Sequence, residues 1–125
     1  MTLNEYQKKA MTTCMPSCNN ISYMLLNLVG EVGEFSSKLA KHIRKEEAAI
    51  GQEGDSQLYW RQELAESEIT HNRELLSKEL GDILWQLSGV CSVMGFSLEG
   101  VARQNLNKLA DRAKRNKIDG NGDER

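Results

Sequence analysis

The chain has 125 residues and a formal net charge of −2, so it has no bulk electrostatic attraction for nucleic acid or for an anionic membrane. Its length suits a single domain, residues 1–125, with a hydrophobic core of its own. No apolar run approaches the roughly 20 residues that cross a bilayer, and the opening "MTLNEYQKKA" lacks the apolar segment of a signal peptide. The three cysteines, an odd number, argue against a disulfide framework. We therefore expect a cytoplasmic protein without nucleic-acid or membrane partners.

The first third of the chain is predicted to be helical. "LNEYQKKAMTT" is amphipathic, and Pro16 with its polar neighbours ends that helix. A second helix is expected from about Ile21 to about Lys45, because apolar residues recur there every three or four positions.

The rest of the chain contains an insertion, two more helices and a tail. Residues 46–72 are polar and glycine-containing at first and then read "LYWRQELAESEI", which is typical of a short helix or a mobile flap. A third helix is expected from about Arg73 to Met94, and a fourth from Ser97 to about Arg115. The tail, residues 116–125, is rich in glycine and charge and is predicted to be loop-like. Because strand signals are almost absent, the sequence predicts an all-α domain.

Two similar four-residue patterns, "EVGE" and "ELGD", place carboxylates three residues apart: Glu31 with Glu34, and Glu79 with Asp82. Residues three apart share a helix face, and each pair adjoins the apolar stripe of its helix. If the two stripes pack together, four carboxylates flank one seam, where they repel one another and lose hydration. A hard divalent cation relieves both effects, and oxygen ligands suit Mg²⁺ or Mn²⁺.

Glycines within the acidic turns support this metal-site hypothesis. A mid-helix glycine costs roughly 0.5–1 kcal/mol relative to alanine, so Gly30, Gly33 and Gly81 predict the close approach of another helix or a ligand. The alternative is that the acids are solvated and paired along their own helices, since Glu34–Lys38 and Lys78–Asp82 have four-residue spacing. Two matching pairs, each beside a core stripe, favour the metal site.

The fourth predicted helix carries three polar residues that share one face: Asn105, Lys108 and Arg112. Cations near the C-terminal end of a helix also simply complement its dipole. Beside a metal site they have another use, because Lys and Arg bind phosphate oxygens while the metal bridges others. The combination predicts a polyphosphate substrate.

These residues lie in segments that resemble a known family. "GEVGEF", "KELGDILWQL" and "NLNKLADR", together with "LNEYQKKA" and "RAKRNKIDGNGDER", are similar to the MazG-like all-α nucleoside triphosphate pyrophosphohydrolases. The family signature is E-x-x-E followed by E-x-x-D, and it is matched position by position by Glu31, Glu34, Glu79 and Asp82. The resemblance implies a Mg²⁺-dependent enzyme that converts a (d)NTP to (d)NMP and pyrophosphate. It also implies a four-helix-type bundle that assembles as a homodimer or homotetramer, with sites near subunit interfaces.

The resemblance also assigns roles to individual residues. The four acids would be the metal ligands and catalytic residues, and one of them, for example Glu34, would orient the attacking water. The substrate contacts would be Asn105, Lys108 and Arg112, with Lys38, one turn beyond Glu34, as a further candidate.

One departure from the family pattern is the long spacer between Glu34 and Glu79, whose excess falls at residues 46–72. Tyr59 and Trp60 in this insertion have the chemistry to stack on a base, but anchoring of the insertion to the core is the preferred interpretation. Trp85, one turn past Asp82, is likewise interpreted as a core residue.

Two other functions share part of this pattern. Dimeric dUTPases and phosphoribosyl-ATP pyrophosphohydrolases have the same acidic arrangement, although the short chain disfavours a dUTPase. A non-catalytic helical oligomerisation or adaptor module would account for the apolar stripes. It would not account for acids paired twice across a glycine.

Overall fold

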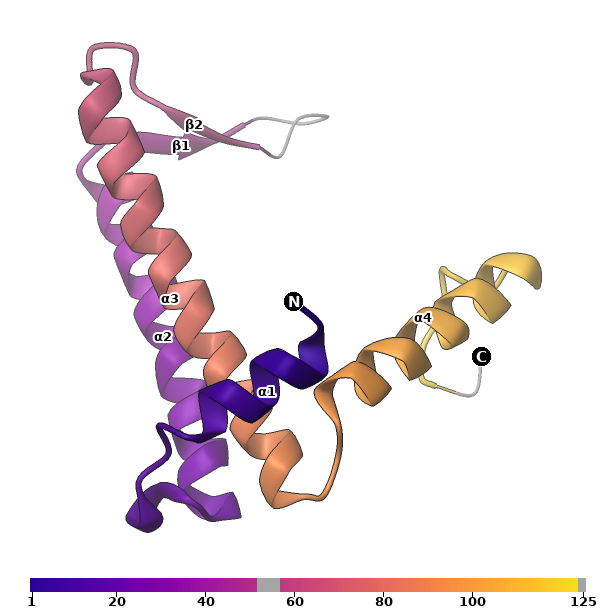
Figure 1. Cartoon of the computed structure of the whole chain (residues 1–125). Coiled ribbons are helices and arrows are strands. Elements are labelled where there is room, and N and C mark those ends of the chain that lie inside the picture. The colour runs from indigo at the N-terminus through magenta and orange to yellow at the C-terminus, as the bar shows by residue number, and fades with distance from the viewer. Residues whose placement is uncertain (52–56, 124–125) are drawn as a thin grey trace.

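The computed structural model describes residues 1–51 and 57–123, and these residues form four α-helices, one 3-10 turn and one small sheet. An antiparallel pair of long helices, α2 and α3, is the main body; α1 lies across it, and α4 leaves in another direction (Figure 1). The elements are α1 (Leu3–Met11), η1 (Pro16–Cys18), α2 (Ile21–Arg44), β1 (Ala48–Ile50), β2 (Leu58–Trp60), α3 (Glu66–Val93) and α4 (Leu98–Lys114).

α1, α2 and α4 begin at residues whose side chains accept hydrogen bonds from their first backbone N–H groups. The side chain of Asn20 accepts a hydrogen bond from the Tyr23 backbone N–H at 2.8 Å, and Ser97 Oγ accepts one from the Gly100 N–H at 2.8 Å. Such caps define the N-terminal ends of α2 and α4. The predicted bounds of these two helices are therefore confirmed to within a residue at each end, and the described tail to residue 123 contains no helix or strand.

The insertion is where the structure departs from the sequence prediction. β1 and β2 form an antiparallel hairpin in which Ala48 is opposite Trp60 and Ile50 is opposite Leu58. The predicted short helix or flap is instead a strand followed by the first two turns of α3, which begins at Glu66 and not at Arg73. Acidic residues in the first turn of α3 complement the helix dipole and so stabilise this N-terminal extension of the helix, although it has no apolar stripe. The described fold is thus mostly helical, with a small sheet added.

A buried polar contact fixes how α2 and α3 meet. Gln86 is fully buried; its Oε1 accepts from Asn27 Nδ2 at 2.7 Å, and its Nε2 donates to the Met24 carbonyl at 3.2 Å. Gly89, one turn further along α3, leaves room for the fully buried Met24 side chain. Together these contacts set the level at which the two helices face each other.

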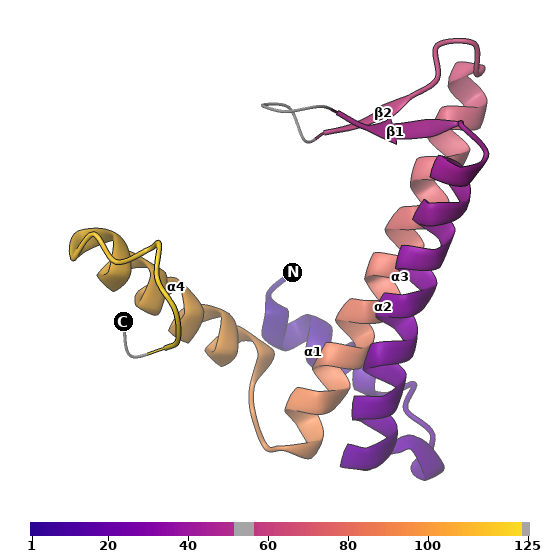
Figure 2. The ribbon, with the colours of Figure 1, turned by 180° about the vertical axis from the view of Figure 1, so that it is seen from behind.

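α1 joins the other helices through side-chain hydrogen bonds. The Trp85 indole N–H donates to the Ala10 carbonyl at 3.1 Å, so Trp85 attaches α1 to α3, in keeping with its interpretation as a core residue. Gln7 Nε2 donates to the Phe96 carbonyl at 3.0 Å, and Gln7 Oε1 accepts from the Leu98 N–H at 2.7 Å. α4 is therefore attached at its first turn, and the rest of it extends away from the α2–α3 pair (Figure 2). A single chain is not a closed four-helix bundle.

One side of the α2–α3 pair exposes apolar side chains at helical spacing. Val29 is 73% exposed and Leu80 is 51% exposed. We call this surface the apolar face; it consists of Leu25, Val29, Val32, Leu80, Leu84 and Leu87. An amphipathic helix pair normally buries such a surface against another layer.

Two further predictions concern the cysteines and membrane insertion. Cys14, Cys18 and Cys91 are free thiols, and the pKa of the Cys91 thiol is raised because it is buried. Among the described residues, no helix has both the length and the apolar character to span a bilayer.

We predict that Gly89→Ala destabilises the protein by about 1–3 kcal/mol, because a methyl group would overpack a full core. A Cβ at residue 89 would lie 2.7 Å from Met24 Cε and closer still to Sδ. The matched control is Gly81→Ala, where the described structure leaves a Cβ in open space; it should gain roughly 0.5–1 kcal/mol of helix propensity. Urea unfolding measures the free energy of unfolding of both variants. Equal stabilities of Gly89→Ala and Gly81→Ala would contradict the close packing at Gly89.

Candidate metal and nucleotide site

The pairing of α2 with α3 brings acids from both sequence patterns together. Carboxylate oxygens of Glu31, Glu79 and Asp82 lie within 4.8 Å of one another. Glu31 comes from α2, and the other two come from α3, where a spacing of three places them on one side of the helix. The arrangement concentrates three negative charges at the edge of the helix seam. We call these three residues the acid cluster.

Glu79 is the buried member of the acid cluster, only 7% exposed. Its Oε1 accepts a hydrogen bond from Lys38 Nζ across the helices, while its Oε2 is buried and has no hydrogen-bond partner in the part of the chain that the structure describes. A buried carboxylate oxygen without a partner costs about 1–3 kcal/mol or more. A ligand that supplies positive charge beside Oε2 would remove that cost.

The environment of the acid cluster raises the pKa of one of its members, Glu31, and of a neighbouring residue, Tyr6. The pKa of Glu31 is raised chiefly by burial and then by the negative charges of Glu34 and Asp82, although a hydrogen bond from Asn27 Nδ2 at 3.2 Å partly opposes this. Burial, followed by the charge of Asp82, raises the pKa of Tyr6 on α1. The site therefore resists additional negative charge until a cation is present.

Glu34 and Lys38 occupy different positions from those that spacing alone suggests. Glu34 is exposed and is not among the three clustered acids, although its charge acts on Glu31. Lys38 pairs with Glu79 on the facing helix, and this hydrogen bond is the main cause of its raised pKa. The structure thus brings Lys38 to the cluster and leaves Glu34 at its rim.

The polar residues of α4 form a separate group. Lys108 Nζ and Arg112 Nη2 both donate to Asp123 Oδ1, at 2.9 Å and 3.1 Å, and Asn105 lines a cavity with Lys108. Within the described residues, the hydrogen bonds of Lys108 and Arg112 are to the tail of the same chain and not to the acid cluster. One chain therefore does not bring its α4 cations to its own acids.

Two cavities lie between α2 and α3, one on each flank of the seam. Successive helix positions are rotated by about 100°, so Lys38 and Leu39 face different flanks. The cavity on the flank of Lys38 has a volume of about 320 Å³ and is lined by Lys38, Lys41, His42, Lys45, Glu47, Asn72, Leu75 and Leu76. Spacing within one segment does not predict this cavity, because its walls come from both helices and from the residues before β1.

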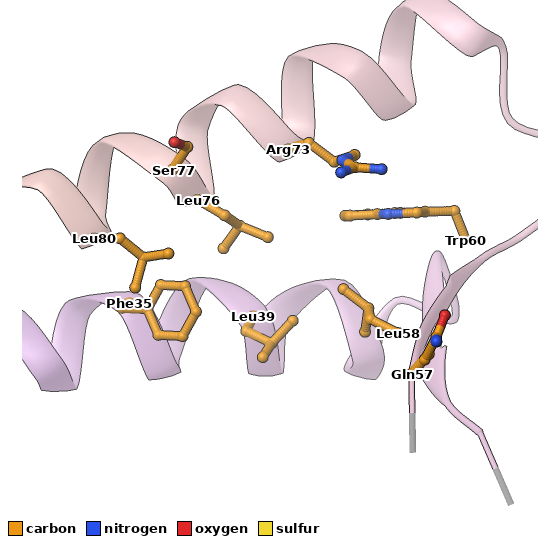
Figure 3. A pocket seen from close by; sticks show the side chains of 9 residues that line it. All are labelled: Phe35, Leu39, Gln57, Leu58, Trp60, Arg73, Leu76, Ser77 and Leu80. Carbon is orange, nitrogen blue, oxygen red and sulfur yellow. The ribbon is translucent and has the colours of Figure 1, made fainter. Parts of the chain in front are cut away.

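The second cavity is apolar, about 550 Å³ in volume, and lies under the hairpin (Figure 3). Phe35 and Leu39 on α2 face Leu76 on α3 across it, and Trp60 from β2 closes its end (Figure 3). The seven-residue spacing of Leu39 and Val32 places this cavity on the same flank as the apolar face.

Trp60 anchors the hairpin to α2, which is the role preferred from the sequence. Its ring meets that of His42 edge to face, with centroids 5.2 Å apart. His42 Nδ1 is 2.9 Å from Glu47 Oε2, and this contact is the main reason that the pKa of Glu47 is lowered. Tyr59 points to the other face of the hairpin and is exposed.

Comparison with known proteins identifies the family of the chain. Residues 19–116 match the MazG nucleotide pyrophosphohydrolase domain. The chain belongs to the MazG nucleotide pyrophosphohydrolase family. It is 34% identical over 109 residues to the Gene 37 protein of Mycobacterium phage L5, an alignment that covers 87% of this chain and 80% of that protein. No solved structure matches the chain significantly.

The acid cluster of this MazG chain has the chemistry of a divalent-cation site. Three carboxylates supply only oxygen ligands, as Mg²⁺ and Mn²⁺ prefer. The unpartnered Oε2 of Glu79 and the raised pKa of Glu31 both indicate charge that a cation would neutralise. The residues present therefore fit a bound metal ion.

The glycines of the two MazG signature patterns do not have the role expected within one chain. A Cβ at Gly33 or Gly81 would meet no atom within 4 Å in the described residues, and one at Gly30 would have an ordinary contact with Asn27 Oδ1 at 3.6 Å. No part of the described chain approaches these turns closely.

We predict that Glu31→Gln raises the melting temperature in EDTA by roughly 2–4 °C, because it removes one of three neighbouring negative charges. The glutamine retains an oxygen that can accept from Asn27. Added Mg²⁺ should stabilise the wild type by mass action and the variant much less, as measured by a thermal melt with and without the metal. Glu74→Gln, an exposed site on the same α3, is the control. An equal Mg²⁺ response in all three proteins would count against a metal at the acid cluster.

Proposed function

We propose that the protein is a nucleoside triphosphate pyrophosphohydrolase that converts a (d)NTP to (d)NMP and pyrophosphate, with Mg²⁺ or Mn²⁺ as its cofactor. The observation that carries this proposal is the acid cluster, which forms from both signature patterns of a MazG-family chain. Three carboxylates within 4.8 Å match the need of a triphosphate for a bridging cation.

The roles of the side chains follow from their positions. Glu31, Glu79 and Asp82 would hold the cation, which when bound polarises the phosphoryl group and lowers the pKa of a water. Glu34 stands at the rim, exposed and without a place in the cluster, so it would accept the proton of the attacking water or orient that water. Lys38 would move from Glu79 to a phosphate oxygen, where its positive charge would form a charge-assisted hydrogen bond.

The cavity beside Lys38 is our proposed place for the nucleoside. It adjoins the acid cluster, and its volume of about 320 Å³ suits a base with part of a sugar. Leu75 and Leu76 supply an apolar wall, and Asn72 supplies an amide that can donate to and accept from a base edge. An apolar wall with a few polar groups is typical of small-molecule sites.

The phosphate contacts of α4 would come from a second copy of the chain. Asn105, Lys108 and Arg112 lie on a helix that extends away from the acids of its own chain. The exposed apolar face offers the surface for association, since contiguous apolar patches of this kind mark interaction sites. We therefore propose a homodimer or homotetramer in which α4 of one subunit reaches the acid cluster of another.

We predict that Asp82→Asn and Glu34→Gln each lower kcat for Mg²⁺-dependent pyrophosphate release by about 100-fold or more, with little change in the melting temperature. A panel of ribo- and deoxyribonucleoside triphosphates, assayed for pyrophosphate, measures both activity and base preference. Glu74→Gln should turn over like the wild type. Wild-type turnover in Asp82→Asn would remove the metal site from the proposal.

If the wild type shows no turnover, and neither Mg²⁺ nor mixed nucleotides shift its melting temperature, the protein is a non-catalytic module.

We predict that Val29→Glu dissociates the assembly, because a charge placed on the apolar face cannot be buried without a partner. Val29 is 73% exposed in the single chain, so the substitution leaves the fold of the subunit intact. Light scattering coupled to size exclusion should give a dimer or tetramer for the wild type and a monomer for the variant. Ser37→Glu, on the same helix but off the apolar face, should assemble normally. A monomeric wild type would contradict the proposed interface.

A further inference from the structure

The C-terminal tail returns along α4 and contacts its cations (Figures 1 and 2). Left-handed backbone at Asn116 (φ 57°) and Gly122 (φ 77°) accompanies this reversal. Asp123 Oδ1 accepts hydrogen bonds from Lys108 Nζ at 2.9 Å and from Arg112 Nη2 at 3.1 Å, and the Gly122 carbonyl accepts a second bond from Arg112 Nη2 at 3.2 Å. The tail therefore places a carboxylate on the two cations that we assign to the phosphates.

This contact leaves Arg112 incompletely satisfied. Arg112 is only 4% exposed, yet its buried Nε has no hydrogen-bond partner among residues 1–51 and 57–123. Asp123 uses a single oxygen for both cations, so it does not form the two-pronged contact that a guanidinium favours. A phosphate group has enough oxygens to bind Nε and Nη2 of Arg112 and still reach Lys108.

Asp123 itself is weakly held in place. Its side chain is 82% exposed, and the cavity next to it, about 320 Å³ in volume, is lined by Val101, Gln104, Asn105, Lys108 and Asp123. Water screens an ion pair whose carboxylate is exposed, so the free energy that these two contacts contribute is small. An anion entering beside Asn105 could therefore replace the carboxylate without disrupting packed structure.

We propose that Asp123 is an internal competitor of the substrate: it occupies the anion site of Lys108 and Arg112 in the empty protein, and the outer phosphates of the nucleotide displace it. The proposal rests on the proposed function for the identity of the anion. The carboxylate keeps the two cations neutralised and aligned while the site is empty. The same carboxylate weakens the binding of every phosphate that must displace it.

The test measures the binding of inorganic pyrophosphate, without metal, to the full chain by isothermal titration calorimetry. Asp123→Asn should bind pyrophosphate about three- to tenfold more tightly than the wild type, the scale expected for the loss of two ion pairs whose shared carboxylate is exposed to water. Asp123→Glu keeps the charge and should bind like the wild type. Asp119→Asn, which removes one negative charge from the same tail, is the control for net charge. Unchanged or weaker binding by Asp123→Asn, or equal tightening by Asp119→Asn, would overturn the proposal.

Turnover separates this proposal from the proposed function. With an active wild type, Asp123→Asn should lower KM for the nucleotide by a similar factor and leave kcat unchanged. A failure of nucleotide hydrolysis in the wild type refutes the proposed function, while the pyrophosphate titration still decides whether Asp123 guards an anion site. If hydrolysis occurs and the titration shows no tightening, the competitor role fails and the enzyme assignment stands.

Discussion

The buried amide of Gln86 is the contact on which the candidate site depends. A fully buried amide without hydrogen-bond partners costs about 1–3 kcal/mol of folding free energy. The partners of Gln86 are on α2: the Asn27 side chain and the Met24 carbonyl. Sliding one helix along the other would break both hydrogen bonds. Asn27 also donates to Glu31 Oε1, so the Asn27 amide that pairs with Gln86 also holds a member of the acid cluster. Apolar stripes alone would tolerate several registers.

The sequence predicts the helices and the two acidic faces, because both depend on spacing within a segment. It does not predict which acids meet. Glu34 matches the signature as well as Glu31 does, but its helix position turns it toward the rim, and only the packing of α2 on α3 decides this. The direction of α4 is equally hidden, since it is set by Gln7 and Phe96, which are 89 residues apart in the chain.

The hairpin and the roles of the glycines depend on contacts between distant segments, which local sequence patterns do not reveal. Strands of three residues, such as Leu58–Trp60, are too short for a recognisable alternation of side chains, and the contact between Trp60 and His42 that secures them joins separate elements. Gly33 and Gly81, which the sequence pattern indicated as functional, have open space beside them in the described structure, whereas Gly89 is required by a packed side chain, that of Met24. Glycine in a helix is visible in a sequence, but the atom that faces it is not.

Because α4 is attached at its first turn, a small rotation there produces a large displacement at its C-terminal end. Gln7 holds its base through a hydrogen bond to Leu98, and Arg112 lies fourteen residues further on, or about 21 Å along the axis. A tilt of about 10° at Gln7 would therefore move Arg112 by about 4 Å, more than the length of a hydrogen bond. Small changes in the position of α1 are thus amplified at the far end of α4, and the half-buried amide of Gln7 influences where those cations lie.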